Sequence, residues 1–269
     1  MMRFSKYMGI PYYLWLVIFV IAPLFLLIYQ SFFDIEGQLT LANYLQYFTS
    51  IDYLIMTISS FVVAALITLF SFILAYPLAY VLARSNHRDY LFLFMVILPT
   101  WMNLLLKIYV FIGLLAQNGP IISLLAHLGW GQPQLLFTNF AFILVAVYLE
   151  LPFMVLPIYN SITEIPSSME EASSDLGASR LQTLLRVILP MSREGIRSGV
   201  QTVFIPSLSL FMLTRLIGGN RVITLGTAVE QHFLVTQNWG MGATIGVILM
   251  AVMILVMYLT REKGGSADA

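Results

Sequence analysis

Residues 166–190, PSSMEEASSDLGASRLQTLLRVILP, form the longest polar interval in a chain of 269 residues that is otherwise mostly apolar. Apolar residues recur around its first half at the spacing of one helical face: Ile165, Met169, Ala172 and Leu176. Pro166 suits the opening of this helix, because the amide hydrogen that proline lacks has no partner in a first turn. The pattern therefore predicts a short amphipathic helix.

A glycine separates this helix from a second one. Gly177 stands at the position after a helix end that favours a left-handed backbone. Ser179 and Gln182 have the spacing of a capping box, and Pro190 is expected to end the second helix. The apolar stripe of that helix consists of Leu181, Leu184, Leu185 and Ile188. The two helices together predict a compact helix–turn–helix at a membrane surface, shaped to fit a partner.

The same interval resembles the EAA loop of bacterial binding-protein-dependent ABC importers. The likeness consists of Glu171-Ala172-Ser173, then Gly177 after three residues, then Val187-Ile188-Leu189-Pro190 after nine more. Ser173 stands for a second alanine and Val187 for the usual isoleucine, both mild departures. The alternative is an amphipathic helix pair that rests on the bilayer. That alternative does not require glutamate, glycine and proline at this spacing.

In that family the loop belongs to the membrane subunit and docks as a coupling helix into a groove of the ATPase subunit. The resemblance therefore implies a cytoplasmic coupling loop at residues 161–197. The residues expected to couple the chain to an ATPase are Glu170, Glu171, Ala172, Asp175, Leu176, Gly177, Ala178, Ser179 and Pro190.

Composition places the chain in a membrane. Hydrophobic residues make up 59% of the chain and charged residues 10%, with a mean hydropathy of +0.88. Long apolar stretches in such a chain indicate membrane-spanning helices. The formal net charge is zero, so bulk electrostatics give no reason to expect nucleic-acid binding. Because the chain contains no cysteine, disulfides, thiolate nucleophiles and cysteine-ligated metals are excluded.

Charge-poor runs predict an all-α membrane protein with a single transmembrane domain over residues 1–269. Six spans are expected at about residues 9–33, 56–83, 90–113, 137–159, 198–217 and 240–260. The first run is long enough to cross a bilayer and starts with Tyr12, Tyr13 and Trp15, which suit a membrane interface. We therefore interpret it as a retained helix and not as a signal peptide.

The distribution of lysine and arginine predicts the orientation of these spans. Ten of the 13 lie in the termini, the 84–89 turn and the 161–197 loop: Arg3, Lys6, Arg84, Arg88, Arg180, Arg186, Arg193, Arg197, Arg261 and Lys263. The others are Lys107, Arg215 and Arg221. Both termini and the coupling loop are therefore expected in the cytoplasm. This orientation agrees with the motif and predicts a multi-pass protein of the bacterial cytoplasmic membrane.

Polar and aromatic residues in the spans are candidates for a transport pathway: Trp101, Asn103, Lys107, Tyr109, Glu150 and Ser209. A charge in hydrocarbon is costly, so Glu150 and Lys107 are functional hypotheses by default. The two differ in expected depth, and a direct pair between them requires helix kinking at a nearby proline. Aromatic faces attract ammonium cations. The alternatives are a structural partner for Glu150, lipid contact for the aromatic residues and a helix–helix interface for Ser209.

No chemistry is expected from the chain itself. It has no G-x-x-x-x-G-K-[ST] phosphate loop, so it should not bind or hydrolyse ATP. Its three histidines are widely separated and do not have the spacing of a metal site. We therefore expect no catalytic residue, metal or cofactor in this chain. ATP and Mg²⁺ are expected to bind to partner ATPase subunits.

Further segments resemble the spermidine/putrescine importer permeases, in particular the first of their two unlike membrane subunits. These segments are PTWMNLLLKIY at 99–109, LPFMVLPIY at 151–159 and DLGASRLQ at 175–182. The resemblance implies the type I ABC importer permease architecture and transport by alternating access. It also implies a second permease subunit, two ATPase subunits and an extracytoplasmic polyamine-binding protein as partners.

Two other functions remain open. One is the permease of a related importer for another organic cation, an oxyanion or iron. An acidic and aromatic cavity around Glu150 and Trp101 favours a polyamine, whereas a basic cavity around Lys107 favours an anion. The other function is that of an ATP-independent channel or secondary transporter. Secondary transporters often show an internal repeat, which this sequence lacks.

Overall fold

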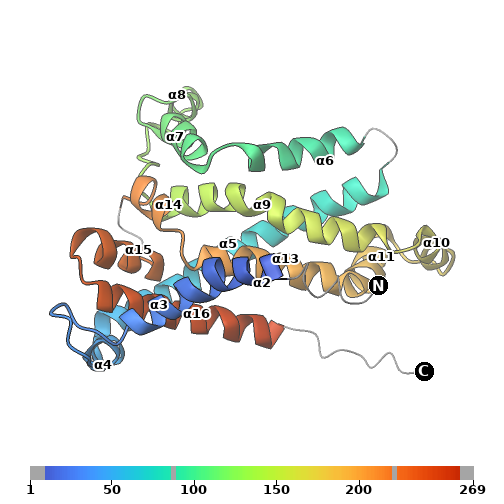
Figure 1. Cartoon of the computed structure of the whole chain (residues 1–269). Helices are drawn as coiled ribbons and strands as arrows, with labels where there is room; N and C mark the ends of the chain where they lie inside the picture. Colours follow the sequence, from blue (N-terminus) through green and yellow to red (C-terminus); the bar gives the residue numbers. More distant parts are fainter. Residues whose placement is uncertain (1–9, 86–88, 220–222, 261–269) are drawn as a thin grey trace, which may run out of the picture. The chain divides into compact units, whose positions relative to one another are not determined.

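The computed structural model describes residues 10–85, 89–219 and 223–260 (Figure 1). The regular elements in this part of the chain are helices, apart from one antiparallel bridge between Phe33 and Leu39. The chain divides into two compact units. The first comprises Met1–Thr57 and Leu225–Leu255, and the second comprises Ile58–Thr224 and Val256–Ala269.

The first unit contains the N-terminal helices. Its elements are α2 (Ile10–Leu16), the π-helical turn η1 (Val17–Ile21), α3 (Ala22–Gln30), α4 (Ala42–Thr49), α15 (Leu225–Glu230), the π-helical turn η4 (Gln231–Val235) and most of α16 (Trp239–Thr260). Together α2, η1 and α3 form a nearly continuous apolar helix over the first expected span. Its side chains are largely exposed within this chain, which leaves them to contact lipid or another subunit.

The start of α16 packs against the turn after α3 at a single glycine. A Cβ on Gly240 would lie 1.8 Å from the carbonyl oxygen of Phe33. That oxygen accepts a hydrogen bond from Nδ2 of Asn43 at 2.8 Å. One turn further along α16, the buried Thr244 hydroxyl donates to the carbonyl oxygen of Ser31 at 3.0 Å. Small and hydroxylated residues one turn apart allow this close approach, as in many membrane helix pairs.

The second unit is built on three long helices: α5 (Ile51–Arg84) from Ile58 onward, α9 (Asn139–Thr163) and α13 (Arg193–Ser207). The shorter elements are α6 (Asp89–Ile97), the 3-10 turn η2 (Leu98–Trp101), α7 (Leu104–Leu115), α8 (Pro120–His127), α10 (Ser167–Asp175), α11 (Arg180–Thr183), the π-helical turn η3 (Leu184–Ile188), α12 (Leu189–Met191) and α14 (Phe211–Leu216). Within this unit α10 and α11 lie together at one end, opposite α8 and α14 (Figure 1). The core is aliphatic, and Ile67, Val145, Ile158 and Val203 are fully buried in it.

Two glycines let α13 approach α9 closely. A Cβ on Gly195 would lie 2.5 Å from both the carbonyl oxygen of Pro157 and the Cβ of Ser161. A Cβ on Gly199 would lie 2.8 Å from the sulfur of Met154. The two glycines are one helical turn apart, which is the G-x-x-x-G spacing of closely packed membrane helices. The backbones of α9 and α13 therefore meet with almost no side chain between them.

Five helical stretches in the described part of the chain are long and apolar enough to span a membrane: Pro11–Gln30, Ile51–Arg84, Leu104–His127, Asn139–Thr163 and Trp239–Thr260. They overlap the first, second, fourth and sixth expected spans and the second half of the third. The chain is thus an all-helical, multi-pass membrane protein. The count of six spans, the single domain and the orientation of the termini stay predictions.

Two of the expected spans are not continuous helices. The span at 90–113 is interrupted at Met102, whose backbone is extended with ψ 144°. The side chain of Asn103 caps the next helix by accepting a hydrogen bond from the amide of Leu105 at 2.8 Å. The span at 198–217 is interrupted between α13 and α14, just after Pro206. A proline precedes each break, Pro99 before Met102 and Pro206 before the end of α13, although Pro77, Pro152 and Pro157 lie inside continuous helices.

Several residues used for the orientation lie outside the described residues: Arg3, Lys6, Arg88, Arg221, Arg261 and Lys263. His87 lies outside them as well.

Replacing Gly195 by alanine should destabilise the second unit. The new Cβ would overlap a backbone carbonyl, which cannot rotate away, and such overpacking costs about 1–3 kcal/mol. Gly113→Ala on α7 is the matched control, because nothing lies within 4 Å of a Cβ at that position. We expect a lower thermal unfolding midpoint in detergent for Gly195→Ala than for the control. Equal midpoints would contradict the close packing.

Candidate functional site

The helix–turn–helix predicted at residues 166–190 is present. α10 ends at Asp175, and Gly177 follows with φ +79°, a backbone conformation that side chains with a Cβ rarely adopt. Both hydrogen bonds of the capping box form. The amide of Gln182 donates to Oγ of Ser179 at 3.3 Å, and the amide of Ser179 donates to Oε1 of Gln182 at 2.8 Å.

Of the two prolines of this segment, Pro166 lies at the opening of the first helix, as predicted. It is the N-cap of α10, and its carbonyl oxygen accepts a hydrogen bond from the amide of Met169 at 3.1 Å. Pro190 does not end the second helix, which continues to Met191. In the π-helical turn before it, the amide of Leu189 donates to the carbonyl oxygen of Leu184, five residues earlier. This wider turn carries the helix past the proline.

The outward side of the helix–turn–helix is apolar. Leu176 is 89% exposed at the end of α10, although it was expected on the same helical face as the buried Ile165. The exposed apolar side chains of the segment are Met169, Leu176, Leu181 and Leu185, and we call them the apolar patch. Glu171, Ala172 and Asp175 are exposed beside it. An amphipathic segment with this much uncovered apolar surface suits a protein partner.

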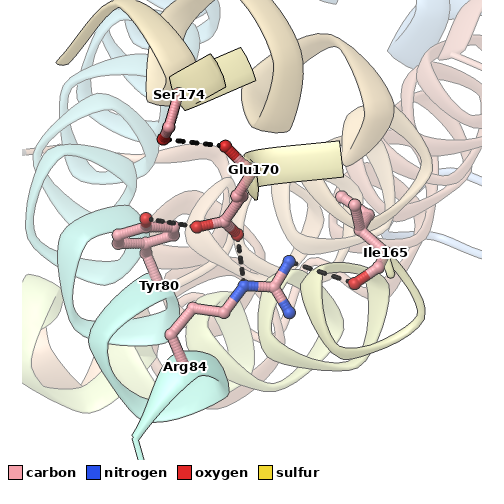
Figure 2. A network of polar contacts seen from close by, with 5 residues as sticks. All are labelled: Tyr80, Arg84, Ile165, Glu170 and Ser174. Atoms are coloured by element: carbon pink, nitrogen blue, oxygen red, sulfur yellow. Dashed lines mark hydrogen bonds and ion pairs between the residues drawn. The ribbon is translucent and has the colours of Figure 1, made fainter. Parts of the chain in front are cut away.

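On its inward side the segment carries polar groups that tie it to α5 (Figure 2). Both carboxylate oxygens of Glu170 are engaged: Oε1 accepts from Nε of Arg84, and Oε2 accepts from the hydroxyl of Tyr80 at 3.0 Å. Arg84 also donates from Nη2 to the carbonyl oxygen of Ile165 at 3.1 Å, just after α9. The Arg84–Glu170 ion pair is largely shielded, with exposed fractions of 21% and 22% for the two side chains. Glu170 therefore faces the interior of this chain, whereas its neighbour Glu171 is exposed.

The other end of the segment is tied to α5 as well. The hydroxyl of Tyr76 is 3.0 Å from Oγ of the fully buried Ser192, at the start of α13. Inside the segment, the hydroxyls of Ser173 and Thr183 are 2.9 Å apart and join α10 to α11. Tyr76 and Tyr80 are not among the residues predicted from the sequence, and Arg84 entered only as an orientation signal. Their i, i+4, i+8 spacing near the end of an apolar helix was the available clue.

Two of the candidate pathway residues, Glu150 and Lys107, are charged side chains on apolar helices. Glu150 is only 7% exposed on α9, and Lys107 is half-buried on α7. Their charges are close enough to interact electrostatically, but they form no ion pair within 4 Å. The break at Met102 lets α7 start anew, so the depth of Lys107 is not set by a straight 90–113 helix.

The remaining four candidates are two exposed aromatic residues and two polar residues that hydrogen-bond to the nearby backbone. Trp101 is 75% exposed, with the ring of Phe94 edge-to-face at 5.8 Å, and Tyr109 is 60% exposed, so both rings are largely uncovered within this chain. Asn103 is engaged as the cap of α7. The Ser209 hydroxyl donates to the carbonyl oxygen of Pro206 at 3.3 Å, at the break after α13, and the Ser209 amide donates to the same oxygen at 3.0 Å. Within the described ranges, no three His, Asp or Glu side chains gather in a group that could hold a metal ion.

Comparison with known proteins places these features in a family. Residues 46–261 match the model of the binding-protein-dependent transport system inner membrane component. The chain is 33% identical to the spermidine/putrescine transport system permease protein PotB of Haemophilus influenzae, over 97% of this chain and 95% of that protein. It is 35% identical to PotB of Escherichia coli strain K12, over 90% of this chain and 91% of that protein.

Solved structures show the same fold at lower sequence identity. A chain of a bacterial alginate ABC transporter, in complex with an alginate-bound periplasmic protein, superposes with a TM-score of 0.82. The two chains are 17% identical, and the match covers 96% of this chain and 92% of that one. At this identity the likeness concerns the fold alone.

Proposed function

The chain belongs to the family of inner membrane components of binding-protein-dependent transport systems, and from this premise we propose that it is the permease subunit of an ATP-driven polyamine importer. The polyamine cargo is inferred from the identity of 33–35% to spermidine/putrescine permeases, which extends over nine tenths or more of both chains. In this proposal it works in the bacterial cytoplasmic membrane with a second permease, two ATPase subunits and an extracytoplasmic binding protein.

The chemistry of the candidate pathway supports a polycationic cargo. Glu150 is a buried acid in the middle of an apolar helix, and such a group usually faces a partner or a pathway inside a membrane protein. Trp101 and Tyr109 offer uncovered aromatic faces, which attract ammonium groups by about 0.5–2 kcal/mol each. In this proposal Glu150 neutralises one ammonium group of the polyamine, while the aromatic rings attract another ammonium group of the same molecule.

The second candidate function is import of an anion, and the positive charge of Lys107 favours it. It is half-buried on α7 and interacts electrostatically with Glu150, so its charge is partly balanced within the chain. A cation site is compatible with this arrangement when Lys107 positions Glu150 and does not line the pathway itself. An anion site would leave Glu150 as a repulsive group. The polyamine proposal therefore accounts for both charges.

The helix–turn–helix at residues 166–190 supports the proposal that a partner subunit supplies the energy. The apolar patch and Glu171 are exposed on a helix–turn–helix that is fixed to the rest of the chain on its inner side. In this proposal the patch fits a groove of an ATPase subunit and Glu171 meets a basic group there. Closure of the ATPases then moves the segment, and the membrane helices alternate between outward-facing and inward-facing states. ATP and Mg²⁺ bind to the ATPase subunits.

ATPase activity of the co-expressed complex in lipid tests the proposed function directly. We expect stimulation by the binding protein loaded with spermidine or putrescine, because cargo delivery should favour the state that closes the ATPases. The empty binding protein is the control. Stimulation only by a binding protein with another cargo would retain the importer and refute the polyamine. If the chain copurifies with no ATPase, the proposed role of the helix–turn–helix in coupling is refuted.

Glu171→Lys should insert normally but lose transport. The substitution reverses an exposed charge beside the apolar patch, and like charges across an interface cost several kcal/mol. Glu164→Lys is the matched control, because it makes the same change at an exposed position just after α9. Polyamine uptake into cells reports the effect. Uptake at the wild-type rate in Glu171→Lys would refute its role in coupling.

Glu150→Gln should reduce polyamine uptake more than assembly of the complex. The amide keeps the size of the side chain but removes the charge that attracts an ammonium group. Glu36→Gln, in an exposed turn, is the control for loss of one acidic group. Uptake by proteoliposomes and the subunits that copurify are measured together. A parallel loss of uptake and assembly would assign Glu150 a structural role.

A further inference from the structure

The last turns of α5 carry three hydrogen-bonding side chains on one face. Tyr76, Tyr80 and Arg84 are spaced at i, i+4 and i+8, and we call them the α5 stripe. Each binds the segment between α9 and α13: Tyr76 contacts Ser192 at its end, while Tyr80 and Arg84 contact Glu170 near its start. One face of one helix thus holds both ends of the helix–turn–helix.

The contacts of the stripe are directional and shielded. Glu170 has both carboxylate oxygens occupied, and the guanidinium of Arg84 bridges to the carbonyl oxygen of Ile165 (Figure 2). Charge-assisted hydrogen bonds of this kind are stronger than neutral ones and fix orientation. Reduced exposure also protects the pair from screening by salt. Glu170 cannot turn outward without breaking several contacts at once.

The α5 stripe spans the position at which the hydrogen bonding of α5 is interrupted. Pro77 lies between Tyr76 and Tyr80 and removes one hydrogen bond from the helical ladder. Proline positions are where helices bend. The turns that carry Tyr80 and Arg84 therefore have a hinge behind them, and the remainder of the 34-residue helix lies beyond it.

We propose that the α5 stripe is the joint that passes movement of the coupling segment to α5, with Arg84 and Glu170 as its positioning residues. The inference rests on the proposed function of the segment as the docking element for an ATPase. Glu170 then has a different task from its neighbour: Glu171 faces the partner, and Glu170 holds the segment to the membrane helix. Without the joint, the ATPase would move a segment that α5 does not follow.

Charge exchange across the ion pair tests the joint in the assembled complex. The variants are Glu170→Ala, Arg84→Glu, and the double variant Arg84→Glu with Glu170→Arg. Uptake per ATP hydrolysed and the subunits that copurify are measured for each. We expect each single change to lower uptake per ATP roughly tenfold, within the usual range of coupling between sites, with assembly retained. The double variant should restore much of that loss.

Glu164→Ala is the matched control, because it removes an exposed carboxylate just before α10 and leaves the stripe intact. Uptake per ATP at the wild-type value in both single variants would overturn the joint. A loss of uptake that follows a loss of assembly, without rescue by the double variant, would overturn it as well and show a purely structural contact.

A second measurement does not depend on transport. The chain has no cysteine, so spin labels can be placed at Val81→Cys on α5 and Ser168→Cys on α10 in the otherwise native sequence. Both positions are exposed. We expect a narrow distribution of label distances in the purified chain, which Glu170→Ala broadens and Glu164→Ala does not. An unchanged distribution in Glu170→Ala would overturn the joint.

The two measurements separate the two proposals. A wild-type complex whose ATPase ignores every loaded binding protein would refute the proposed function, while the label distances would still report whether Glu170 holds α10 to α5.

Discussion

The second unit depends on the close approach of α13 to α9. Gly195 leaves no side chain between the helices, and the carbonyl oxygen of Pro157 occupies the space a Cβ would need. In lipid the hydrophobic effect gives little drive for helices to associate, so such tight contacts must supply the stability. The helix–turn–helix begins just after α9 and ends where α13 begins. The close packing of α9 and α13 therefore helps to set the distance between its two ends.

With its ends fixed, the segment divides its polar and apolar groups in an unusual way. Two of its polar side chains, Glu170 and Ser173, turn inward to hydrogen-bond partners, while Leu176 is left exposed. A lone soluble domain would bury the leucine and expose the acid. The inversion is stable because each inward polar group has a partner, and it leaves an apolar surface for another protein. The same arrangement both anchors the segment and prepares it for binding.

The polar residues of the membrane region are associated with interruptions of its helices. The chain is extended at Met102, and Asn103 satisfies the backbone of the next helix with its side chain. After α13 the contact runs the other way, because the Ser209 hydroxyl donates back to the carbonyl oxygen of Pro206. Irregular backbone at membrane depth is tolerated only inside a protein or beside a water-filled cavity. Both breaks thus need either protein or water around their irregular backbone.

The sequence by itself determined the features that depend on neighbours in the chain. The apolar runs predicted most of the long helices, because the hydrophobicity of a run can be read from the sequence without knowing how the helices pack. Gly177 and the Ser179–Gln182 capping box were predicted correctly, since their contacts lie within a few residues. Only the tertiary structure decided that Glu170 turns inward and Glu171 outward. The two acids have the same local surroundings, and the choice is made by Arg84, 86 positions away. Side chains so distant in sequence meet only after the helices have packed.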